Sequence, residues 1–335
     1  GNIIAIGSIN SSTSDEEVKI YKFSLENQDW NIIGSLEGRK WPRHYGFGRD
    51  GFGQSSIDLS GDGSILAVGA PGDGSYDNEG NFSSPYLMRN GGVRVYKNEN
   101  NTWTQIGNDI KGLFSEGGLG NTVILSEDGL TIVSAGYRDS SKWSTDSTSI
   151  PSPGVLVHKF IDSEWKLIGD NFFHENSSRN VAPNIDLSKD GKLLVIGRGF
   201  EKSTTKNDGV LWGNQNQRVG YIDIHRLENN TWTKLGDSII IDNISSTGVY
   251  PKIASNGSAS NPIVSINIKD GNRDSEVYKF HQNEWIHTDT LPYGHIHELS
   301  SDGSTIAIGT PRGNTFVNGQ IPPPTIKAYK SENLD

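Results

Sequence analysis

Hydrophobic and polar residues alternate with a period of two along most of the chain. Short apolar runs interrupt this alternation at 65–69, 193–197 and 305–309, and each of them ends in glycine. No segment carries the apolar i, i+3, i+4, i+7 stripe of an amphipathic helix. The pattern therefore predicts short β-strands throughout and an all-β fold.

Four elements recur in a fixed order along the chain. An alternating run that ends in Leu-Ser-x-Asp-Gly is followed by an apolar run, then by a Val-x-Val-Tyr type strand, and then by a strand that starts at tryptophan. The repeat tryptophans are Trp30, Trp103, Trp165, Trp232 and Trp285. A four-stranded unit cannot bury both faces alone, whereas radial stacking of such units can. The repeat predicts a β-propeller of four-stranded antiparallel blades; a β-sandwich would not repeat a four-strand unit at this period.

Six repeat units are predicted within a single propeller domain that spans 1–335. Their approximate bounds are 1–38, 52–112, 118–173, 181–241, 249–291 and 293–335. The first unit lacks its opening strand and the last lacks its tryptophan strand, so a seven-bladed ring with part of the chain outside this segment is the alternative. Because the only methionine is Met88, we interpret the segment as an excerpt from a longer precursor.

The second unit carries the most specific motif of the chain. Its residues run from Phe52-Gly53-Gln54-Ser55, through Asp58-Leu59-Ser60-Gly61-Asp62-Gly63, to Gly69-Ala70-Pro71 and Gly92-Val93-Arg94-Val95-Tyr96. This unit resembles the FG-GAP repeat of integrin α-subunit propellers and of related secreted or surface proteins. The resemblance implies an extracellular propeller that acts in adhesion or recognition rather than in catalysis.

The FG-GAP family often binds Ca²⁺ in the loop between its first two strands, through oxygen ligands at alternating positions. Asp58, Ser60 and Asp62 match the first three of these positions. The closing position falls near Leu66, which cannot ligate a hard cation. Asp58 and Asp62 are therefore weak Ca²⁺ candidates, and we expect them to hold a hairpin turn instead. No cofactor is expected.

The composition excludes several classes of site and partner. The chain has no cysteine, which excludes disulfides, thiolate metal sites and a cysteine nucleophile. A net charge of -10 argues against a nucleic-acid partner, because phosphate-binding surfaces need clustered positive charge. No apolar run approaches the ~18 to 20 residues that span a bilayer, so no membrane-spanning helix is predicted.

The longest insertions are predicted on one face, between second and third strands and between units. Binding residues concentrate on such loops. Three of the eight tryptophans lie outside the repeat positions, and all three fall in these insertions together with arginine and tyrosine. The candidate binding residues are Trp41, Arg43, Tyr45, Tyr86, Trp143 and Trp212. Exposed aromatic residues suit a protein partner or sugar rings, and the alternative is that they pack the loops onto the scaffold.

No nucleophile elbow, phosphate-binding loop or His-Glu-x-x-His motif occurs, so we predict that the chain is not an enzyme. The favoured function is a secreted or cell-surface adhesion propeller that assembles with other surface or filament proteins. A glycan-binding, lectin-like propeller is the alternative, and a glycoside hydrolase is less favoured. Seven glycosylation sequons are compatible with a secreted glycoprotein: Asn10, Asn81, Asn100, Asn176, Asn229, Asn243 and Asn256.

Overall fold

The fold is known from a computed structural model of the chain. It describes residues 1–9, 15–39, 50–73, 90–113, 117–136, 154–169, 171–172, 183–201, 218–244, 248–254, 261–268, 274–292, 294, 296–310 and 325–330. These residues form 24 β-strands joined by turns, and none of them is helical. The chain divides into two compact units, 1–175 and 176–335, and each is described by itself.

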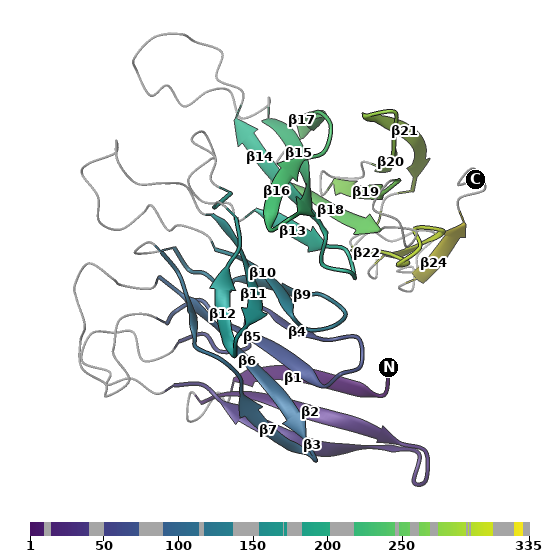
Figure 1. The fold of residues 1–335 in the computed structure, drawn as a ribbon. Coiled ribbons are helices and arrows are strands. Elements are labelled where there is room, and N and C mark those ends of the chain that lie inside the picture. The colour runs from purple at the N-terminus through teal and green to yellow at the C-terminus, as the bar shows by residue number, and fades with distance from the viewer. Residues whose placement is uncertain are drawn as a thin grey trace. The chain divides into compact units, whose positions relative to one another are not determined.

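Three antiparallel sheets make up the described part of the first unit, and their main strands follow chain order (Figure 1). The first sheet contains β1 (Ile3–Ile9), β2 (Glu16–Ser24) and β3 (Asp29–Glu37). The second contains β4 (Ile57–Leu59), β5 (Ile65–Ala70), β6 (Gly92–Glu99) and β7 (Thr102–Gln105), with β8 (Ile110–Lys111) also paired to β6. The third contains β9 (Thr122–Leu125), β10 (Thr131–Ala135), β11 (Val155–Ile161) and β12 (Glu164–Leu167).

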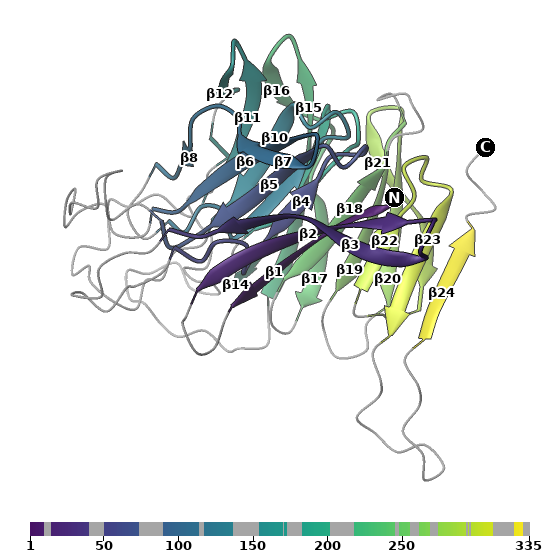
Figure 2. The ribbon, with the colours of Figure 1, turned by 90° about the horizontal axis from the view of Figure 1, so that it is seen from below.

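The second unit repeats this arrangement in its described residues (Figure 2). Its first sheet contains β13 (Asn184–Leu187), β14 (Leu193–Glu201), β15 (Arg218–Glu228) and β16 (Thr231–Lys234), with β17 (Ile239–Ile244) also paired to β15. The next contains β18 (Val249–Ala254), β19 (Ile263–Ile268), β20 (Ser275–His281) and β21 (Glu284–Leu291). The last contains β22 (Ile296–Leu299), β23 (Thr305–Thr310) and β24 (Thr325–Lys330).

The Ser-x-Asp-Gly segments form the tight turns between first and second strands. In the β4–β5 turn, Ser60 Oγ donates to Asp62 at 2.7 Å and accepts from the backbone N–H of Ile65 at 2.9 Å. Gly63 closes this turn with a φ of 72°, in the left-handed region that glycine tolerates best. The same serine–aspartate hydrogen bond recurs at three other turns, at Ser126, Ser188 and Ser300. The serine–aspartate hydrogen bond therefore explains why these segments form the predicted hairpin turns.

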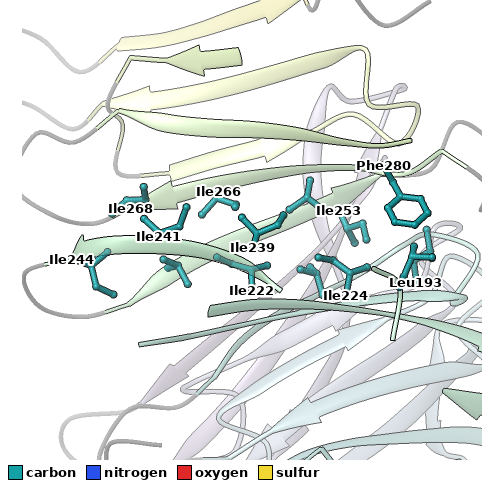
Figure 3. Close-up of a cluster of buried hydrophobic side chains, with 14 residues drawn as sticks. Leu193, Ile222, Ile224, Ile239, Ile241, Ile244, Ile253, Ile266, Ile268 and Phe280 are labelled. Carbon is teal, nitrogen blue, oxygen red and sulfur yellow. The ribbon is translucent and has the colours of Figure 1, made fainter. Parts of the chain in front are cut away.

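The hydrophobic core lies between the faces of neighbouring sheets within each unit. In the second unit, isoleucines of β15 and β17 pack against isoleucines of β18 and β19, and Phe280 closes one end of the row (Figure 3). The repeat tryptophans extend this packing. Trp165, which is 4% exposed, donates its indole N–H to the carbonyl of Ile106 in the preceding sheet at 3.1 Å. Trp285 does the same to Leu235 at 2.8 Å.

The all-β prediction is confirmed, because each sheet is an antiparallel run of consecutive strands. The β1 sheet has three strands that correspond to the second, third and fourth of the repeat, and the β22 sheet has the first three. Among the described residues, no helix is long and apolar enough to cross a membrane.

Candidate functional site

Strand β6 carries an arginine where the fold demands apolar side chains. Val93 and Val95 on either side of Arg94 are fully buried, and Arg94 itself is only 2% exposed. A buried guanidinium needs ionic partners, because desolvating an unpaired charge is costly. Its Nη2 atom lies 2.7 Å from Asp50 Oδ2 and 2.5 Å from Asp73 Oδ2. Both aspartates are themselves buried, so the three side chains form an ionic core.

A second, partly exposed arginine also pairs with the carboxylates of this site. Arg39 Nη1 lies 2.8 Å from Asp109 Oδ2 and 3.3 Å from Asp73 Oδ2. The backbone N–H of Arg39 also donates to Asp50 Oδ2 at 3.1 Å. Together with Glu16, described next, these residues are called the loop-base cluster: Glu16, Arg39, Asp50, Asp73, Arg94 and Asp109.

Glu16 at the start of β2 joins the first sheet to this cluster. Its Oε2 atom accepts from the backbone N–H of Phe52 at 3.0 Å, and Gln54 donates to its Oε1 atom. Burial, together with the hydrogen bond to Asp50 and the charge of Asp50, raises the pKa of Glu16 to about 7, although backbone hydrogen bonds act to lower it. Glu16 is therefore partly protonated at neutral pH, and the proton relieves repulsion between the two carboxylates.

The loop-base cluster stands at the ends of two insertions. Arg39 and Asp50 border 40–49, and Asp73 lies directly before 74–89. Backbone hydrogen bonds join the same points, from Gly72 N–H to Asp50 O and from Gly91 N–H to Asp73 O, both at 2.8 Å. The cluster thus holds the ends of both insertions at one place on the scaffold.

The FG-GAP-like residues pack directly beneath the cluster. Phe52 is fully buried and lies 5.3 Å from the Arg94 guanidinium carbon, at the face of the ring. Gly53 has a φ of 68°, and a Cβ atom there would come within 2.3 Å of Val18 Cγ2. Its N–H donates to the carbonyl of Gly69 at 2.8 Å. The glycine of this motif therefore allows the first two sheets to pack closely against each other.

The six aromatic and arginine candidates from the sequence lie outside the described residues: Trp41, Arg43, Tyr45, Tyr86, Trp143 and Trp212. Four of the sequons do as well: Asn10, Asn81, Asn176 and Asn256. Asn100 and Asn229 occupy exposed turns before the repeat tryptophans, with φ of 56° and 50°, and Asn243 belongs to β17.

Asp58 and Asp62, the weak Ca²⁺ candidates, have separate structural partners. Asp62 accepts hydrogen bonds from Ser60 and Ser64 within its own turn. Asp58 Oδ2 accepts from the backbone N–H of Leu125 in β9, at 2.7 Å, and so binds one sheet to the next.

Asp186 in the second unit repeats the Asp58 contact, accepting from the N–H of Ile253 in β18 at 2.9 Å. Burial raises the pKa of Asp186 to about 6, although Lys252 and this hydrogen bond both act to lower it. Sequence reasoning missed this sheet-to-sheet contact, which the repeated Asp-Leu-Ser pattern could have indicated.

At the register position of Arg94, the second unit has an acidic residue, Asp223, whose partners are basic. Arg94 lies one residue after Val93, the partner of Gly69, and Asp223 lies one residue after Ile222, the partner of Gly197. Asp223 is 2.7 Å from Lys234 Nζ and 3.8 Å from Arg198 Nη1. These charges lower the pKa of Asp223 against the opposing effect of burial. One blade position therefore supports either charge, provided that partners of the other sign surround it.

No family model matches the chain, and no curated protein matches its sequence. Solved structures do match. Hydrazine synthase of Kuenenia stuttgartiensis has 12% identity and a TM-score of 0.54, over 98% of this chain and 83% of that one. The β-propeller domain of the Trilobed protease of Pyrococcus furiosus has 9% identity and a TM-score of 0.47, over 96% and 81%. A putative 6-phosphogluconolactonase of Bacteroides fragilis has 13% identity and a TM-score of 0.40, over 92% and 87%.

The chain has a β-propeller fold. The repeated antiparallel sheets carry this conclusion, and six blades are consistent with the six described sheets. The FG-GAP resemblance stays a prediction, because no family model matches. The likeness to hydrazine synthase, at 12% identity, concerns the fold alone.

The prediction that the chain is not an enzyme is contradicted by these comparisons. It rested on the absence of short catalytic motifs, yet similar structures include a putative 6-phosphogluconolactonase. Propellers bring side chains together from separate blades, so a propeller enzyme needs no short motif, and we withdraw the exclusion of catalysis. The comparison assigns no lactonase activity to this chain.

The loop-base cluster also escaped sequence reasoning. The signal that could have found it is Arg94 between two valines in a strand that is buried on both faces, because such a charge must be paired. Its partners Asp50 and Asp73 directly flank the FG-GAP-like motifs. Which carboxylates pair with Arg94 depends on loop paths that composition and periodicity do not specify.

Proposed function

We propose that the chain is a recognition propeller that binds another protein at a cell surface or in a surface filament, through the insertions 40–49 and 74–89. The observation that carries the proposal is the loop-base cluster. It places the buried Arg94, the partly exposed Arg39 and their carboxylates at the ends of these two insertions.

The blade itself does not need an ionic core at this position. In the neighbouring sheet the residue at the Arg94 position is Leu156, since Ser134 pairs with Leu156 as Val68 pairs with Arg94. Leu156 is 3% exposed in an apolar environment. Replacing buried ion pairs by apolar residues is often neutral or stabilising, so a retained pair suggests a need for specific geometry. We infer that the need is to present the two insertions.

The residues in these insertions suit a protein surface. Trp41, Arg43 and Tyr45 belong to 40–49, and Tyr86 belongs to 74–89. Tryptophan, tyrosine and arginine are the residue types that dominate binding energy at protein interfaces. An extracellular location and a role in adhesion belong to the same proposal and are supported by the FG-GAP resemblance. A glycan-binding surface that includes Trp143 and Trp212 is the second candidate, because tryptophan also suits sugar rings.

The test uses the purified 335-residue chain coupled to beads and intact cells of the kind that produces it. We expect the cells to bind the beads, protease treatment of the cells to abolish binding, and periodate oxidation of surface glycans to leave it intact. Changing Trp41, Tyr45 and Tyr86 together to alanine should abolish binding. The matched control is Leu25→Ala, which changes a residue that is 86% exposed in the β2–β3 turn.

Binding that survives protease but not periodate would favour the glycan surface and overturn the protein-binding proposal. Equal binding by the triple variant would show that the two insertions are not the recognition surface.

A further inference from the structure

A pocket of about 340 Å³ lies within the second unit, where the start of β17 meets the β20–β21 hairpin. This volume is at the lower end of the range for small-molecule sites. Its chemically distinctive lining residues are Asp237, Ser238, Tyr278, Asn283, Glu284 and Trp285. We call it the Trp285 pocket. It contains none of the residues on which the proposed function depends.

The first unit has the equivalent contact between a repeat tryptophan and the preceding sheet. We call it the closed joint, because its polar side chain is hydrogen-bonded to the backbone of the tryptophan. Trp165 donates its indole N–H to Ile106, and Asn108, two residues further on, accepts from the backbone N–H of Trp165 at 2.9 Å. In the second unit, Trp285 donates to Leu235, and the residue two positions further on is Asp237. Asp237 accepts no hydrogen bond from the described residues and lines the pocket instead. The second joint thus exposes a carboxylate where the first uses a neutral amide.

Most side-chain donors around the Trp285 pocket are already engaged, and the amide of Asn283 is the exception. The Trp285 indole N–H donates to Leu235 O at 2.8 Å, and the Tyr278 hydroxyl donates to Glu276 Oε2 at 2.6 Å. Ser238 Oγ donates to Asp223 Oδ1 at 2.7 Å. What remains toward the pocket is mainly acceptors, because ionised carboxylates only accept. A ligand for this pocket must therefore supply most of the donors.

Two aromatic rings lie beside the two carboxylates of the pocket. Tyr278 and Trp285 both contribute to its wall, and Asp237 and Glu284 are the charged residues of the lining. Aromatic faces and carboxylates attract the same class of ligand, organic cations. Lys234 lies nearby, but its ammonium group is held by Asp223 at 2.7 Å and by Ser238 at 2.6 Å. The net charge of -10 adds a long-range attraction for cations.

We propose that the Trp285 pocket binds a small organic cation that carries an ammonium or guanidinium group, either as a free amine or as a lysine or arginine side chain. The cation would lie against Tyr278 and Trp285 and donate to Asp237 and Glu284. A sugar fits less well, because a ring of hydroxyls needs several donors from the protein, and among the lining side chains named above only the Asn283 amide still offers them.

The test is isothermal titration calorimetry of the 335-residue chain with putrescine, with acetyl-Gly-Lys-Gly amide and with 1,4-butanediol. Butanediol matches putrescine in length but lacks the charge. We expect saturable binding in the micromolar to millimolar range for putrescine, for the lysine peptide or for both, and none for butanediol. Putrescine alone would indicate a free amine, and tighter binding of the peptide would indicate a side chain.

Two isosteric changes, Asp237→Asn and Glu284→Gln, should together weaken binding about ten-fold or more. Asp237→Asn also reproduces the amide of the closed joint. The matched control is Glu164→Gln, because Glu164 precedes Trp165 as Glu284 precedes Trp285. Unchanged thermal unfolding of the variants would show that they fold. Equal binding of butanediol, absence of binding by both cations, or an equal loss in Glu164→Gln would each overturn the proposal.

Discussion

At the scale of single residues, Arg94 links the ends of the two insertions 40–49 and 74–89. Its guanidinium contacts Asp50 and Asp73, which lie on either side of the β4–β5 hairpin in sequence. Removing the guanidinium would leave two carboxylates buried without their main cation. The large cost therefore comes from the partners that remain rather than from the arginine that is lost.

We expect Arg94→Ala to lower the free energy of unfolding by about 3–5 kcal/mol, the usual cost of breaking a buried ion pair. Arg39→Ala should cost less, because the Arg39 side chain is 31% exposed and water can replace it. Urea denaturation of the two variants in parallel measures the difference. Equal losses would contradict the assignment of Arg94 as the centre of the cluster.

Glu16 makes the stability of the first unit depend on pH. Its pKa is about 7 in the folded chain, against an ordinary value of 4.5, so the folded state binds more protons between these values. Stability from this group is therefore highest below pH 4.5 and falls as pH rises toward 7.

We expect Glu16→Gln to remove this loss, so that the variant loses less stability than the native chain between pH 5 and about 8. The measurement is the urea midpoint at several pH values, with Glu127→Gln as a control at an exposed carboxylate of the same unit. Identical pH profiles for Glu16→Gln and the native chain would show that Glu16 is not the titrating group.

At the scale of elements, sheets are joined by side chains as well as by apolar packing. Asp58 in β4 accepts from β9, and Asp186 in β13 accepts from β18. Both aspartates occupy the middle of a first strand, and each contact reaches the first strand of the next sheet. This regularity means that a repeat residue first considered as a metal ligand has a structural role between blades.

We expect Asp58→Ala to destabilise the chain by about 1–3 kcal/mol, because the N–H of Leu125 would lose its acceptor. Asp58→Asn should cost less, since the amide oxygen can still accept. Thermal unfolding with and without Ca²⁺ measures both effects. A native chain that Ca²⁺ stabilises, and an Asp58→Ala variant that it does not, would instead support the calcium interpretation.

At the scale of the whole molecule, charge is the property that constrains partners most. The chain has a net charge of -10 and an isoelectric point of about 5.3. From this net charge we expect the chain to repel a phosphate backbone at neutral pH and to attract cations.

We expect no retention of duplex DNA by the chain in a gel-shift assay at neutral pH and low salt. Low salt is the stringent condition, because electrostatic binding is strongest there. A positive control is any basic DNA-binding domain at the same concentration. Retention that disappears as salt increases would reveal a basic surface and contradict the exclusion of nucleic acids.

The sequence by itself determined the strands, their turns and the repeat. These depend on neighbours close in the chain: the period-two alternation places side chains on two faces, and Ser60 and Asp62 close their turn locally. The repeat then indicated a propeller, because identical units must bury their faces against one another.

Only the tertiary structure decided which charged and polar side chains meet. Arg94 meets Asp50 and Asp73 from 44 and 21 residues away, and the difference between Asn108 and Asp237 matters only because a tryptophan from the next sheet lies against each. The physical reason is that pairing of distant charges depends on the path of the chain between them, which strand periodicity does not encode.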